Sequence, residues 1–159
     1  MRSTLMIALV LLLAFSGTAR GAERPFAVIV AAGAVDAPLS LEALALIYRR
    51  RQLFWPGGAR IQPANLPADD PLRREFSRCV LGQTPEQTED YWREMYFHGV
   101  LPPHVVASEQ AMLLFVESTP GAIAYVSTCP TDRRVAVVMT FGNVPNCPSH
   151  PATCAPLQD

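Results

Sequence analysis

Residues 65–82 read Asn65-Leu-Pro-Ala-Asp-Asp-Pro-Leu-Arg-Arg-Glu-Phe-Ser-Arg-Cys-Val-Leu-Gly82, which predicts a loop followed by a helix. Asp70 suits the N-cap position, because its carboxylate can accept hydrogen bonds from free N–H groups of the first turn. Pro71 suits the first helical position, where a missing N–H costs nothing. Apolar residues then recur at helical spacing, and Gly82 is typical of a helix end.

The start of this predicted helix is also a candidate anion site. A helix N-terminus that is entered from a loop presents backbone donors and the positive end of the helix dipole. The carboxylate of Asp70 would occupy the same place if it only caps the helix. The residues alone leave both interpretations open.

The first residues of the chain predict an exported protein. Arg2 precedes an apolar run over residues 5–15 that is too short to span a membrane comfortably, and small residues follow it. We therefore expect a signal peptide over residues 1–21, an α/β domain over residues 22–140, and a tail rich in Cys and Pro over residues 141–159. The predicted location is periplasmic or secreted.

The composition excludes some classes of partner. Removal of residues 1–21 leaves 11 Arg and no Lys against 14 acidic residues, a net charge of about −3. A mildly acidic chain offers no broad electrostatic attraction to nucleic acid or to an anionic membrane. We expect neither partner, and no stable insertion into a membrane.

Four cysteines in an exported chain indicate disulfides, because that compartment is oxidising. A bridge between Cys147 and Cys154 would hold the tail, and Cys79 and Cys129 would be the remaining pair. Four cysteines allow three connectivities, and the sequence does not choose among them. A zinc site at Cys147, His150 and Cys154 would lack a fourth ligand nearby, so we expect no metal.

The order of apolar runs predicts an α/β fold in which helices flank a mixed sheet. Pro63 suggests that the second strand lies at an edge or ends early. The aromatic face formed by residues 91–96 suggests a helix that packs into the core. The strands are expected at residues 26–32, 60–64, 105–106, 122–126 and 135–139, with helices over 40–48, 70–82 and 84–97 and from Ser108.

A search for catalytic motifs finds none. The sequence contains no Gly-x-Ser-x-Gly elbow and no His-Glu-x-x-His helix. His98, His104 and His150 are scattered without the spacing of metal ligands. We expect no enzymatic activity and no cofactor.

Four blocks of the sequence resemble the periplasmic phosphate-binding proteins of ABC transporters, and more closely the short single-lobe relatives of that family. Their order and spacing carry the resemblance, which extends from about residue 26 to residue 126. The blocks are Leu39-Ser-Leu-Glu-Ala-Leu-Ala-Leu-Ile-Tyr48 with Phe54-Trp-Pro-Gly-Gly58; residues 65–82; Tyr91-Trp-Arg-Glu-Met-Tyr-Phe97; and Ser118-Thr-Pro-Gly-Ala-Ile-Ala-Tyr-Val126.

The resemblance implies a single lobe of the type 2 periplasmic-binding-protein fold. Full-length members of the family hold an oxyanion between two lobes. Their Ser/Thr-rich donor loop near the mature N-terminus has no counterpart here. Their Ser-Gly-Thr type loop aligns with residues 68–72, where carboxylates replace the small hydroxyl donors, and Ala124 stands where the family usually has Gly.

Two functions follow from the resemblance. The first is an exported solute-binding-like protein that binds phosphate or another small anion. The alternative is an envelope protein–protein interaction module that has lost the anion site and uses the turn at Trp55 and the cluster Arg49-Arg50-Arg51 as its contact surface. These arginines are otherwise a solvated helix end. For the first function the ligand-binding mouth is formed by Asp69, Asp70, Arg73 and Arg74, with Ser40 and Ser108 at neighbouring helix starts.

Overall fold

A computed structural model describes residues 26–34, 39–127, 129–130, 133–141, 147 and 149–150. The expected signal peptide and Cys154 lie outside the described residues. Within them, no helix is long and apolar enough to cross a membrane.

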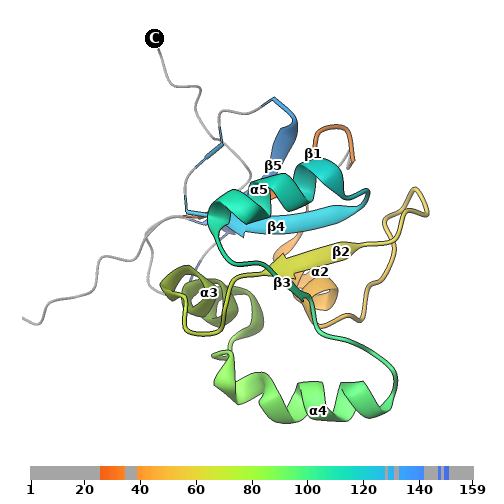
Figure 1. The fold of residues 1–159 in the computed structure, drawn as a ribbon, viewed down its shortest axis with the longest axis vertical. Coiled ribbons are helices and arrows are strands. Elements are labelled where there is room, and N and C mark those ends of the chain that lie inside the picture. The colour runs from red at the N-terminus through yellow and green to blue at the C-terminus, as the bar shows by residue number, and fades with distance from the viewer. Residues whose placement is uncertain are drawn as a thin grey trace, which may run out of the picture.

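The described strands form one mixed six-stranded sheet in the order β3-β2-β4-β1-β5-β6 (Figure 1). β1 pairs antiparallel with both β4 and β5, whereas β2 is parallel to β4 and to β3. The predicted α/β class and mixed sheet are confirmed. The strands are β1 (Phe26–Ala31), β2 (Gln62–Asn65), β3 (His104–Val105), β4 (Ala122–Val126), β5 (Val135–Phe141) and β6 (Ser149–His150).

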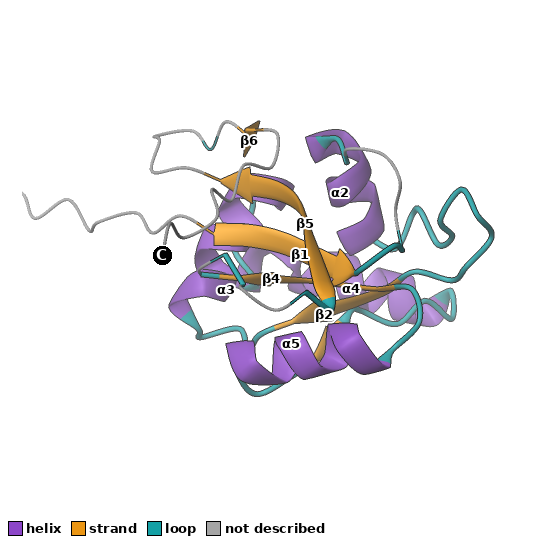
Figure 2. Ribbon diagram, turned by 90° about the horizontal axis from the view of Figure 1, so that it is seen from above, coloured by secondary structure: helices purple, strands orange, loops and turns teal. Residues whose placement is uncertain are grey.

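Helices cover both faces of this sheet. Figure 2 shows α5 on one face and α2 on the other. The predicted caps Ser40 and Ser108 begin α2 and α5, and Gly82 ends the segment after α3 with a φ of 67°. The helices are α2 (Leu41–Tyr48), α3 (Pro71–Phe76), which continues as a π-helix (Ser77–Leu81), a 3-10 helix (Glu86–Thr88) that leads into α4 (Glu89–Phe97), and α5 (Glu109–Ser118).

The expectation that Pro63 places its strand at an edge or ends it early is wrong, because β2 is internal and continues to Asn65. β2 lies between β3 and β4, and Pro63 pairs with Ile123 of β4. The short β3 pairs only with Ala64 and Asn65 among the residues described. Because Pro63 lies before that pairing begins, its missing N–H breaks no bond between β2 and β3.

The expectation that the aromatic face of α4 belongs to the core is also wrong. None of the residues of α4, all of which are described, is buried. Tyr96 is 65% exposed and Phe97 is 82% exposed. α4 lies away from the sheet (Figure 1), and the hydroxyl of Tyr91 ties it to the body by donating to the carbonyl of Arg49 at 2.7 Å. An aromatic stripe is buried only where another element reaches it, and here α4 projects beyond the sheet.

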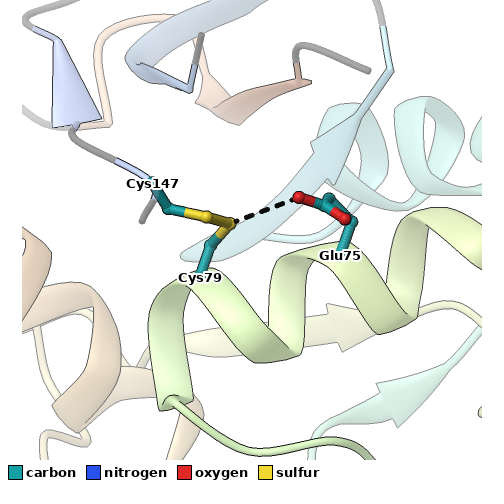
Figure 3. The surroundings of a disulfide bond; sticks show 3 residues. All are labelled: Glu75, Cys79 and Cys147. Carbon is teal, nitrogen blue, oxygen red and sulfur yellow. Dashed lines mark hydrogen bonds between the residues drawn. A yellow bond between two sulfur atoms is a disulfide. The ribbon is translucent and has the colours of Figure 1, made fainter. Parts of the chain in front are cut away.

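The disulfide in the described residues joins Cys79 to Cys147, whose Cα atoms lie 5.2 Å apart (Figure 3). Cys129 is disulfide-bonded as well. The pairings of Cys147 with Cys154 and of Cys79 with Cys129 are therefore wrong. The fold places the π-helix beside Cys147, a long-range proximity that cysteine spacing does not encode.

Gly121 is required by the turn before β4. Its φ is 77°, and a Cβ there would overlap the carbonyl oxygen of Arg60. The substitution Gly121→Ala is expected to lower the free energy of unfolding by about 2 to 3 kcal/mol in chemical denaturation. Gly33→Ala is the matched control, because Gly33 has a φ of 76° and open space around its Cα. It isolates the backbone cost of about 1 kcal/mol, and equal losses in both variants would contradict the steric contribution of Arg60.

Candidate functional site

The parallel pairing of β2 and β3 brings the starts of two helices to one end of the sheet, where the C-termini of these strands lie. α3 follows β2, and α5 follows β3. The backbone N–H of Val106 donates to the carbonyl of Asn65 at 2.9 Å, so the two chain segments that leave the strands remain in contact. Asp70 and Ser108, which begin these helices, therefore lie at the same end of the sheet.

Asp70 caps α3 as predicted. Its Oδ1 accepts from the backbone N–H of Leu72 at 2.8 Å and from that of Arg73 at 3.2 Å. Asp69 is exposed in the preceding turn. The carboxylate of Asp70 thus takes up two of the backbone donors that an anion would otherwise use.

Both predicted serines are also occupied as caps. Ser108 Oγ accepts from the N–H of Ala111 at 3.2 Å, and Ser40 Oγ accepts from the N–H of Ala43 at 3.1 Å. α2 follows β1. Because β1 is antiparallel to β4, it finishes at the opposite end of the sheet. The described contacts do not join Ser40 to the other predicted site residues.

Glu109, a carboxylate outside the predicted site, binds the residue that follows β4. Glu109, in the first turn of α5, accepts from Ser127 through the backbone N–H at 2.5 Å and through Oγ at 2.8 Å. Because Ser127 directly follows β4, the donors at this end of β4 are satisfied by the protein itself.

Arg74 is committed to an ion pair. Its Nη2 lies 2.5 Å from Oε1 of Glu86, and its Nη1 lies 3.3 Å from Oε2. This two-pronged contact is typical of Arg with a carboxylate. It connects α3 to the 3-10 helix. It also neutralises the positive charge of Arg74, which was predicted to bind an anionic ligand.

Arg73 differs from every other residue of the predicted mouth. It is only 8% exposed, and its Nε and Nη1 atoms have no hydrogen-bond partner among the described residues. Burial lowers the pKa of its guanidinium, while the nearby hydroxyls of Tyr125 and Tyr48 act in the opposite direction. A buried cation without a counter-charge costs several kcal/mol unless an anion or hydrogen-bond acceptors reach it.

Ser77 is a second buried polar side chain without a partner. It lies one helical turn after Arg73, is fully buried, and its Oγ makes no hydrogen bond in the described structure. It is not among the site residues predicted from the sequence. Its position beside Phe76 and one turn before Val80, on the predicted apolar face, is the signal that could have identified it.

Aromatic side chains lie near Arg73 and pack on Phe76 of the same helix. Phe76 stacks on Tyr125 with ring centroids 3.9 Å apart and lies 4.5 Å from the ring of Tyr48. The hydroxyl of Tyr125 accepts from the N–H of Leu66 at 3.1 Å and donates to Oδ1 of Asn65 at 3.3 Å. Burial raises the pKa of both Tyr48 and Tyr125, so both hydroxyls are neutral donors at neutral pH.

The surface proposed for a protein partner is largely engaged within the fold. Trp55 is buried, and its Nε1 donates to the carbonyl of Gly121 at 3.1 Å. Arg49 donates to the carbonyl of Leu81 at 2.9 Å, and Arg50 donates to that of Ile61 at 3.1 Å. Arg51 is exposed. The cluster therefore stabilises neighbouring main chain more than it forms a solvated helix end.

One group of side chains has the spacing of metal ligands. The ligand atoms of Glu75, Cys79 and Cys147 lie within 4.8 Å of one another (Figure 3). Both sulfurs are shared in the disulfide, so neither thiolate is available to a metal. The same bond removes Cys147 from the zinc site considered with His150 and Cys154.

Solved structures share this fold. An ABC-type phosphate transport receptor from Vibrio cholerae matches with a TM-score of 0.58 and 22% identity, over 72% of this chain and 45% of the receptor. This chain therefore has the fold of part of that protein. A Clostridium perfringens protein, described as a phosphate ABC transporter substrate-binding protein and solved with bound phosphate, matches with a TM-score of 0.55 and 18% identity, over 72% of this chain and 44% of that protein.

The receptor fold confirms, at the level of architecture, the resemblance drawn from the four sequence blocks. The chain spans less than half the length of either receptor. No family model and no curated protein sequence matches it.

Proposed function

We propose that this protein is an exported, non-catalytic solute-binding lobe that binds a small oxyanion such as phosphate. The observation that carries the proposal is the buried guanidinium of Arg73, which has no counter-charge within the described structure. The fold shared with phosphate transport proteins supports the choice of ligand. The apolar run after Arg2 supports export to the periplasm or secretion.

The position of Arg73 favours a ligand over a purely structural role. Three other arginines have acceptors: Arg49 and Arg50 donate to main-chain carbonyls, and Arg74 pairs with Glu86, although Nε of Arg50 is also buried without a partner in the described structure. Arg73 is the most buried of the four and lacks such an acceptor. Its burial is therefore unfavourable in the free protein and becomes favourable when an anion binds.

Thermal melting of the purified, oxidised protein across phosphate, sulfate, molybdate and small carboxylates tests the proposal. An anion present at about 100 times its Kd should add about 2.7 kcal/mol to the free energy of unfolding. For a chain of this size the melting temperature should rise by several degrees and saturate with concentration. A flat response to every anion would overturn the proposal.

The substitution Arg73→Met should separate binding from stability. Removal of an unpaired buried charge is expected to raise the free energy of unfolding of the anion-free protein by about 1 kcal/mol or more. The same substitution should abolish the stabilisation by anion. Both quantities are read from melting curves with and without phosphate.

Arg78→Met is the matched control, because Arg78 lies on the adjoining π-helix and is exposed. It should change the free energy of unfolding by no more than about 0.5 kcal/mol and leave the response to anion intact. A destabilised Arg73→Met protein that still responds to phosphate would show that Arg73 has only a structural role.

A further inference from the structure

Resting on that function, we infer that Arg73 and Ser77 together hold the anion on the inner face of α3 and its π-helical extension, and that this site selects a compact, singly charged anion. The predicted mouth at the helix start is then not the binding position. Asp69, Asp70 and Arg74 do not hold the ligand in this arrangement.

The donors of this site come from one face of one continuous helical segment. Arg73 and Ser77 are four residues apart, which places their side chains next to each other on a helix. Nε and Nη1 of Arg73 and Oγ of Ser77 are all buried and without partners in the described residues. An anion with several oxygens that reaches this face would accept from Oγ of Ser77 and from one side of the guanidinium, because Nε–H and Nη1–H point to different sides and cannot share one acceptor. No described protein group does so.

The π-helical geometry also supports an anion site on this face of the helix. The segment Ser77–Leu81 begins at the second donor, and its wider turn departs from the α-helix at that point. Such π-turns are often found at functional sites. The N–H of Ser77 donates to the carbonyls of Arg73 and Arg74, so the backbone stays bonded while the serine hydroxyl remains free.

The charge of the surroundings selects the charge of the ligand. Arg73 supplies one positive charge, and the hydroxyls of Tyr48 from α2 and Tyr125 from β4 supply none, because burial raises the pKa of both. Asp70, at the start of α3, adds negative potential near Tyr125. A monoanion would leave the guanidinium and ligand neutral together, whereas a dianion would leave a net negative charge in a buried place, which is costly.

Binding isotherms for anions of known charge test this inference. The intact protein is titrated with nitrate, formate and sulfate at constant ionic strength, in a chloride-free buffer whose own anion is a bulky organic sulfonate. Nitrate and formate are expected to bind at least about tenfold more tightly than sulfate. Phosphate should bind more tightly below its second pKa, where it is singly charged, than above it.

Variants locate the site. Ser77→Ala should weaken nitrate binding several-fold, and Arg73→Met should abolish it, while Arg78→Met and Glu86→Gln should leave it unchanged. Glu86→Gln releases Arg74 from its ion pair without touching Arg73. The melting temperature of each anion-free variant confirms that it is folded.

The outcomes distinguish this inference from the proposed function. Equal or tighter binding of sulfate, or undiminished binding by Arg73→Met and Ser77→Ala, would overturn the inference and leave an anion-binding protein. Absence of binding by every anion would overturn both. Tighter binding of nitrate in Glu86→Gln, in which Arg74 is released, would return the site to the predicted mouth around Arg74.

Discussion

Removal of the disulfide between Cys79 and Cys147 is expected to lower the free energy of unfolding by about 4 kcal/mol. The bond closes a loop between residues separated by 68 positions, and the entropy that such a loop removes from the unfolded chain corresponds to about that value. The double variant Cys79→Ser/Cys147→Ser is preferred, because it leaves no unpaired thiol. Denaturation by urea, with and without the substitutions, measures the loss.

The control for this prediction is the wild-type protein denatured in the presence of a reducing agent. Reduction also opens the disulfide of Cys129, so the reduced wild type should be at least as unstable as the double variant. A double variant that loses less than about 1 kcal/mol would contradict the loop-closure argument.

Phe76→Ala is expected to lower the free energy of unfolding by about 3 to 5 kcal/mol, as for other buried Phe residues. Phe76 is fully buried and touches the rings of Tyr125, Tyr48 and Phe26. Its removal leaves a cavity where α3 meets the sheet and α2. Chemical denaturation measures the change.

Two controls bracket this result. Phe76→Leu keeps most of the volume and should cost less than about 1.5 kcal/mol if the site repacks. Phe54→Ala removes the same side chain from an exposed position and should change the free energy of unfolding by no more than about 0.5 kcal/mol. Similar losses in Phe76→Ala and Phe54→Ala would show that α3 does not depend on the aromatic cluster.

Local signals predicted much of the fold. The caps Ser40, Asp70 and Ser108 and the stop at Gly82 act within a few residues of their positions, so the sequence contains their partners. The apolar runs that became β1 and β4 are also continuous in the chain. These elements could be placed without knowledge of the tertiary structure.

The predictions that proved wrong concern residues whose environment is determined by distant segments of the chain. Pro63 lies in an internal strand because β3 reaches only its C-terminal half. The aromatic face of α4 stays exposed because no described element covers it, and the pairing of Cys79 depends on where the chain goes after β5. The residues near Pro63, α4 and Cys79 in the sequence do not indicate any of these three outcomes.

The candidate site was predicted only in part for the same reason. Arg73 was expected at the site, but its neighbour Arg74 looks the same in sequence and is neutralised by Glu86. Ser77 was not among the predicted site residues. The distinction between a satisfied and an unsatisfied side chain requires the positions of all surrounding acceptors, which only the folded chain provides.

The central position of β1 has a consequence for the order of folding. β1 is made first among the strands, yet both of its neighbours, β4 and β5, are about a hundred residues further along the chain. During synthesis the apolar residues of β1 therefore remain unpaired until the chain has emerged to about residue 141. Contacts of such long sequence separation slow folding, so the emerging protein should be a client for holding chaperones until β5 arrives.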